Sequence, residues 1–221
     1  MRGADGRLRH VTVPRSRTEI DTRRPPKLHE IRPGVFYVDI TRLTAEEFDA
    51  ALSKLARAEG LVFDVRGYPT GSPKWLTHLS PDRLQSAHWY VPKTHRPDHA
   101  EMEWRTNRWN LEVGQPQLTS NRVFLTDGSA ISYAESLMGI VEAYRLGEIV
   151  GEPTAGTNGN VCPVDLPLGY TMAFTGMKVL KHDGSRHHGV GILPTVPMPR
   201  TIQGIRDGRD EQLERALSLL K

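Results

Sequence analysis

Two serines stand where the sequence could support nucleophilic chemistry, in the segment Thr126–Gly139 (TDGSAISYAESLMG). The segment follows a short apolar run and leads into an apolar run of helical period. A serine at the start of a helix can attack an acyl carbon, because the helix N-terminus offers unpaired N–H groups to the oxyanion. Ser132 is the first candidate and Ser129 the second. The simpler interpretation is that Ser132 caps the helix, with Glu135 as its capping-box partner.

Candidate general bases follow later, in the segment His182–Val190 (HDGSRHHGV). A neutral histidine within reach of Ser132 could take its proton, and we expect His188 first and His187 second in this role. Histidines on a surface loop are the simpler alternative. A metal site is a third, but no neighbouring cysteine or acid cluster completes a ligand spacing.

Other reactive side chains have plainer explanations. Lys178 and Lys181 are further candidates for the base, but solvated lysines at a strand edge are more common. Cys162 is the single cysteine, so no internal disulfide or cysteine zinc cluster can form, and we expect a small packed residue there. The histidines and tryptophans of residues 66–120 could line a substrate cleft or pack within a surface lobe.

Two β–α–β units are predicted to position these segments. Each consists of an apolar strand, an amphipathic helix and a second strand, and two such units favour an α/β domain with a parallel sheet. Segments that follow the carboxyl ends of parallel strands meet at one edge of the sheet, so the candidate residues could converge there. The expected elements are strands 34–40, 61–65, 123–126 and 148–150, and helices 44–60 and 132–146.

Weaker patterns mark the remaining chain. We expect a short strand at 8–13, hairpin-like strands at 170–174 and 177–180, and an amphipathic helix at 209–221. No apolar run is long enough to cross a membrane, and no signal peptide or cofactor motif is evident. The formal net charge of +3 comes from a basic segment, residues 1–32, which lacks interleaved aromatics, so we expect no nucleic-acid binding.

Four segments together resemble the S41 peptidase family, the C-terminal processing and tricorn-type serine proteases. The segments Asp64–Gly71 (DVRGYPTG), Ser129–Glu135 (SAISYAE), Val150–Gly156 (VGEPTAG) and Gly189–Thr195 (GVGILPT) occur in the order of the family's motifs. The resemblance covers roughly residues 34–221. It implies a crotonase-like core, residues 33–221, with residues 1–32 as the remnant of a peptide-binding PDZ module and its linker. A parent protein that is periplasmic or secreted is compatible with this resemblance.

The resemblance also implies roles for individual residues. Ser132 matches the nucleophile, and the oxyanion donors would be the N–H groups of Tyr133 and of Gly71 or Gly67. Many members use a Ser/Lys dyad, but the lysine position reads Thr157 here, and tricorn-like members draw a histidine from a region before the PDZ module. The general base is therefore His188 or His187, or lies outside this chain.

The sequence thus predicts a serine hydrolase without a cofactor, acting on peptides through an acyl-enzyme. Two alternatives remain open. One is a carboxylesterase that uses the same serine on small esters. The other is an inactive fragment or peptide-binding module that lacks its base. A homo-oligomer is compatible with all three.

Overall fold

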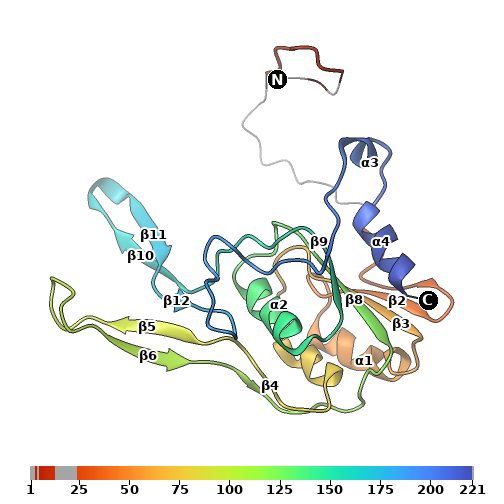
Figure 1. Cartoon of the computed structure of the whole chain (residues 1–221), viewed down its shortest axis with the longest axis horizontal. Helices are drawn as coiled ribbons and strands as arrows, with labels where there is room; N and C mark the ends of the chain where they lie inside the picture. Colours follow the sequence, from red (N-terminus) through yellow and green to blue (C-terminus); the bar gives the residue numbers. More distant parts are fainter. Residues whose placement is uncertain (1–2, 4, 13–23, 221) are drawn as a thin grey trace.

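The computed structural model describes residues 3, 5–12 and 24–220, which form a mixed α/β structure around one six-stranded sheet (Figure 1). The strand order is β1-β2-β3-β8-β9-β13. β1 is antiparallel to β2, and every other neighbouring pair is parallel. The strands are β1 Leu28–Arg32, β2 Val35–Asp39, β3 Gly60–Asp64, β8 Asn121–Thr126, β9 Glu148–Gly151 and β13 Val196–Pro197.

Helices cover both faces of this sheet. The helices α1 (Ala45–Leu55) and α2 (Tyr133–Tyr144), with the 3-10 helix η1 (Pro73–Leu79), pack on one face, and α4 (Glu211–Leu219) packs on the other. Along β3 the side chains alternate between these two cores, since Leu61 and Phe63 face the first and Val62 faces the second. Burial on both faces explains the nearly continuous apolar strands.

The two predicted β–α–β units are confirmed. β2, α1 and β3 form the first, and β8, α2 and β9 form the second. Thr44 and Glu47 have the residue types and the spacing of a capping box, which predicts a helix start here. α1 begins with that capping box: Thr44 accepts from the Glu47 N–H, and the Glu47 carboxylate accepts from the Thr44 N–H. The C-terminal amphipathic helix is also confirmed as α4.

A buried ionic network fixes α4 against the ends of β2 and β3. The Arg66 guanidinium donates to both Asp64 and Asp210, and Asp210 also caps α4 by accepting from the Leu213 N–H. Burial would raise the pKa of Asp64, but Arg66 holds it below its usual range. Asp39 accepts from Arg42 and Arg24 in the same network. Arg24, from early in the sequence, and Asp210, from late in it, therefore both belong to the network around the segment that follows β3.

Two two-stranded arms extend from the core (Figure 1). One pairs β5 (Trp89–Lys93) with β6 (Glu103–Asn107), and β12 (Lys178–Val179) joins its edge. The other pairs β10 (Val161–Asp165) with β11 (Thr171–Thr175), joined through η2 (Pro167–Gly169). The remaining elements are β4 (Leu84–Gln85) paired with β7 (Asn110–Leu111), and α3 (Ile202–Arg206).

The structure corrects several local expectations. Segments 170–174 and 177–180 do not pair with each other: β11 pairs with β10, and β12 pairs with β5. Cys162 is exposed rather than packed in a core, because it lies on the β10–β11 arm. Residues 28–32, expected in the N-terminal segment, form strand β1 of the central sheet. The strand expected at 8–13 is reduced to a bridge at Leu8 within residues 8–12, and residue 13 lies outside the described residues.

Across the described residues, no helix combines the length and apolar character needed to cross a bilayer.

Candidate active site

Ser132 occupies a strained turn between β8 and α2. It is the residue immediately before the helix, and its backbone has φ 51° and ψ −104°, a region that non-glycine residues rarely adopt. Such strain costs on the order of 1–3 kcal/mol and persists where the surrounding structure enforces it, commonly at functional sites. The turn leaves Ser132 half-buried, beyond the carboxyl end of a central parallel strand, where sites form in open α/β sheets.

Glu135 holds this turn in place from the first turn of α2. Its buried carboxylate accepts from the Ser132 N–H at 3.1 Å, in the predicted capping box. It also accepts hydrogen bonds from the loop that follows β9: the Thr154 hydroxyl at 2.7 Å, the Gly156 N–H at 2.6 Å and the Thr157 N–H at 2.8 Å. One side chain thus binds the candidate nucleophile's backbone to the loop after the neighbouring strand.

His187 lies against the same carboxylate. Its Nε2 lies 3.3 Å from a Glu135 oxygen, and both side chains are almost fully buried. Burial would raise the pKa of Glu135, but the contacts from His187 and Thr154 outweigh burial and lower it. Glu135 is therefore a carboxylate near neutral pH. His187, a candidate base from the sequence, is directed at Glu135 in this structure.

His188 is held in a defined tautomer on the other side of this loop. Its Nε2 lies 2.7 Å from the Asn158 carbonyl oxygen, which can only accept, so Nε2 carries the proton and Nδ1 is free to act as a base. Among the described residues, no histidine or lysine is hydrogen-bonded to the Ser132 hydroxyl. The structure brings His188 to the Asn158 loop but does not place it in contact with Ser132.

The other candidate bases have partners away from Ser132. His182 Nε2 is 2.7 Å from the Gln85 carbonyl oxygen, and Lys181 forms an ion pair with Glu142 at 2.7 Å. Lys178 lies over the rings of Tyr90 and Trp104 in the β5–β6 arm. These contacts favour structural roles for all three side chains.

Ser129, the second candidate nucleophile, is hydrogen-bonded within the turn that precedes Ser132. Its N–H and its hydroxyl both donate to the carboxylate of Asp127. The next residue of the turn, Ala130, accepts through its carbonyl from the Ala155 N–H at 3.1 Å. These bonds shape the turn and leave Ser132 as the serine with the less constrained hydroxyl.

Two of the predicted oxyanion-hole segments meet at Tyr133. The Tyr133 hydroxyl donates to the Gly71 carbonyl at 2.7 Å, so the loop after β3 is bound to the first residue of α2. The Tyr133 N–H belongs to the first helical turn, whose donors lack helical partners. Gly67 lies nearer the start of the same loop, with φ 135° and Thr41 against it. Of the two glycines, Gly71 is the one that contacts Tyr133 in this structure.

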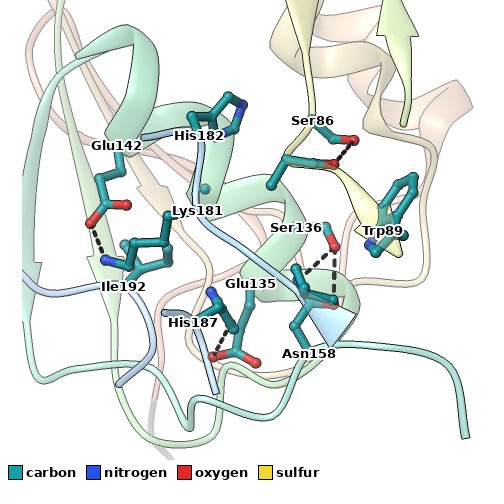
Figure 2. Close-up of a pocket in the computed structure, with 13 residues that line it drawn as sticks. Ser86, Trp89, Glu135, Ser136, Glu142, Asn158, Lys181, His182, His187 and Ile192 are labelled. Carbon is teal, nitrogen blue, oxygen red and sulfur yellow. Dashed lines mark hydrogen bonds and ion pairs between the residues drawn. The ribbon is translucent and has the colours of Figure 1, made fainter. Parts of the chain in front are cut away.

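A small pocket lies along the flank of α2 rather than over Ser132 (Figure 2). Glu135, Ser136 and Glu142 of α2 form one wall, and Ser136 is hydrogen-bonded to Asn158 across it. Trp89, at the base of the β5–β6 arm, is also at the pocket, together with the segment 181–187. The pocket thus places one tryptophan of the predicted cleft near the candidate site.

Trp109 of the proposed cleft also lies near the candidate site, with its ring centroid 5.0 Å from that of Trp89 and 5.5 Å from that of Tyr133. The other residues of the proposed cleft are dispersed. Trp75 and His78 are buried under the sheet in η1, and Trp104 is 41% exposed on β6. His95 and His99 are exposed near the tip of the β5–β6 arm. The sequence did not single out Thr154 or Asp127, which shape the site. Both could have been found from the sequence by their position, because Thr154 follows β9 and Asp127 follows β8, and functional residues gather after the carboxyl ends of parallel strands.

Comparisons with known proteins agree with this fold. The sequence profile of peptidase family S41 matches residues 34–198. A candidate peptidase of Parabacteroides merdae ATCC 43184 superimposes with a TM-score of 0.71 at 20% identity, covering 87% of this chain and 63% of that one. Mature CPAF gives a TM-score of 0.66 at 15% identity, over 85% of this chain and 50% of that one.

The photosystem II D1 C-terminal processing protease superimposes with a TM-score of 0.55 at 20% identity, covering 84% of this chain and 46% of that one. This chain therefore spans about half to five-eighths of the length of these solved structures. At these identities the superpositions establish a shared fold. No curated protein matches the sequence.

Proposed function

Because the chain belongs to peptidase family S41, we propose that it is a serine hydrolase that cleaves peptide bonds with Ser132 as the nucleophile. The observation that carries the proposal is the strained backbone of Ser132 at the mouth of α2, held there by Glu135. A simple helix cap does not require a positive φ, because cap residues normally adopt extended backbone angles. Thr44, which caps α1 at φ −81° and ψ 164°, provides the contrast within this chain. Family membership also supports a crotonase-like core.

The proposed reaction begins when the Ser132 oxygen attacks the carbonyl carbon of the substrate and its proton passes to a base. The oxyanion accepts hydrogen bonds from the Tyr133 N–H and the Gly71 N–H. The C–N bond then breaks, the amine leaves with the proton from the base, and the acyl group stays on Ser132. Water attacks this acyl-enzyme and releases the acid. We assign the base to His188 through Nδ1, with its Nε2–H fixed by the Asn158 carbonyl.

A second candidate function has an observation in its favour. His187 contacts Glu135, His188 contacts Asn158, and neither is hydrogen-bonded to Ser132. Because neither histidine reaches Ser132 in this structure, the second candidate is a peptide-binding module that keeps the fold of the family and lacks its base. An esterase would share the proposed site, because activated esters expel their leaving group without protonation.

Hydrolysis assays on matched variants separate these functions. We would measure cleavage of a fluorogenic peptide panel and of p-nitrophenyl acetate by the wild type, Ser132→Ala and Ser129→Ala, after circular dichroism confirms folding. The proposal predicts peptide cleavage that falls at least about 1,000-fold in Ser132→Ala. Ser129→Ala should stay within about tenfold, since that serine only shapes the turn. Ester cleavage alone would favour an esterase, and neither activity in folded wild type would favour the binding module.

A further inference from the structure

The β10–β11 arm carries a continuous apolar face. The register pairs Cys162 with Phe174 and Val164 with Met172, and directly paired residues project from the same face of a hairpin. Beyond these pairs, the Leu166 N–H donates to the Tyr170 carbonyl at 2.7 Å, which continues the pairing toward the tip. We call the resulting surface the arm face. It consists of Cys162, Val164, Leu166, Tyr170, Met172 and Phe174.

The arm face is exposed to solvent throughout. Phe174 is 50% exposed, Met172 49% and Tyr170 68%, and none belongs to either core. The six side chains expose roughly 500 Å² of mostly apolar surface, which is at the upper end of patches on monomeric proteins. An isolated two-stranded hairpin is only marginally stable in water, and strands that alternate in this way normally bury their apolar face.

We propose that the arm face is the contact between two copies of this chain. A two-fold axis places the same patch on both partners, so a surface that is uniformly apolar is complementary to itself. Pairing would bury about 1,000 Å² in total, which reaches the lower limit for a specific interface. The one charged residue of β10 and β11, Asp165, pairs with Thr171 on the opposite face. Two copies with the same net charge can therefore approach through this surface without repulsion.

A lipid surface fits the arm less well. Segments that bind anionic membranes carry lysine or arginine beside their apolar residues, and residues 160–176 contain neither. The strongest concentration of basic residues is in the first 32 residues of the sequence, not in the arm. The chemistry of the arm therefore favours an uncharged, apolar partner surface, and a second arm face supplies one.

Sedimentation velocity on the 221-residue chain over a range of concentrations tests the pairing. We expect a monomer–dimer equilibrium with a Kd on the order of 1–100 μM, as for an interface of this size. Phe174→Glu places a charge in the arm face and should abolish the dimer. Ala173→Glu adds the same charge at the adjacent position on the opposite face and should leave the dimer intact. A wild type that stays monomeric throughout, or equal loss of the dimer in both variants, would overturn the proposal.

The single cysteine gives a second readout at the interface. Cys162 lies on the arm face and pairs with Phe174, so dimerisation should slow its reaction with a maleimide. The protection should grow with protein concentration in the wild type and in Ala173→Glu, and be absent in Phe174→Glu. A reaction rate independent of concentration in a dimeric wild type would place the interface elsewhere. Binding of the monomer to phosphatidylcholine vesicles through Phe174 would assign the arm face to lipid instead.

Discussion

Replacing Glu135 by glutamine tests whether one buried carboxylate organises the candidate site. The two carboxylate oxygens accept hydrogen bonds from four donors: the N–H groups of Ser132, Gly156 and Thr157, and the Thr154 hydroxyl. In Glu135→Gln one oxygen becomes an NH₂ group, so two of the four donors would face another donor. The side chain keeps its size and the packing of α2 is preserved.

The expected loss of stability follows from these contacts. A buried donor left without a partner costs about 1–3 kcal/mol, so two of them cost about 2–6 kcal/mol. The weakened contact with His187 adds to this loss, because the amide carries no charge. We therefore expect the free energy of unfolding at pH 7 to fall by about 2–6 kcal/mol. Labelling of Ser132 by a fluorophosphonate should slow as its turn loosens.

The stability that Glu135 contributes should depend on pH in a definite direction. The pKa of Glu135 is lower in the folded protein than in the unfolded chain, where a glutamate titrates near 4.3. Ionised Glu135 therefore contributes its full stability above about pH 5, and the contribution is lost as the pH falls through the folded-state pKa. Glutamine does not titrate. The stability difference between wild type and Glu135→Gln should be largest near neutral pH and should shrink on acidification.

Urea unfolding followed by tryptophan fluorescence, at pH 7 and at several lower values, measures this difference. Glu142→Gln is the matched control, since Glu142 lies on the same helix and pairs with Lys181 in a partly exposed ion pair. The control should cost less than about 1 kcal/mol. Equal, small losses for both variants, or a Glu135→Gln deficit that does not change with pH, would refute the role given to this carboxylate.

Three further variants probe the contacts around the site. Asp210→Ala leaves the buried Arg66 guanidinium with one partner fewer, and urea unfolding should show a loss of about 2–3 kcal/mol. Tyr133→Phe removes the hydroxyl that donates to the Gly71 carbonyl; we expect a loss of about 1 kcal/mol in the same assay and slower fluorophosphonate labelling. Gly151→Ala places a Cβ 2.0 Å from the Thr126 carbonyl oxygen at a φ of 131°, so circular dichroism should show a loss of folded protein.

Local patterns were sufficient to predict the inner sheet and its helices. Leu61–Val65 is a nearly continuous apolar run and Val123–Leu125 is a short one, and strands buried on both faces have this character. The capping box at Thr44 and Glu47 marked the start of α1 correctly. The position of Ser132 between a strand and a helix was predicted in the same way, because β8, the turn and α2 follow one another directly in the sequence.

Contacts between distant segments could not be predicted from such patterns. β12 pairs with β5 about ninety residues earlier, and no local signal indicates that register. The two adjacent histidines look equivalent in sequence, yet His187 is buried against Glu135 and His188 donates to Asn158. Cys162 was expected to be a small packed residue, because no basic neighbour or helix start in the sequence marks it as a nucleophile. Its exposure depends on how the arm projects, which only the tertiary structure reveals.

The central claim is that Ser132 is an activated nucleophile, and covalent labelling tests it most directly. The folded chain would be treated with a fluorophosphonate probe, which modifies serines that a base activates, and the modified site would be mapped by peptide mass spectrometry. The account predicts modification at Ser132, absent in Ser132→Ala and retained in Ser129→Ala. Folded wild-type protein that remains unmodified, or that is modified at Ser129 instead, would contradict it.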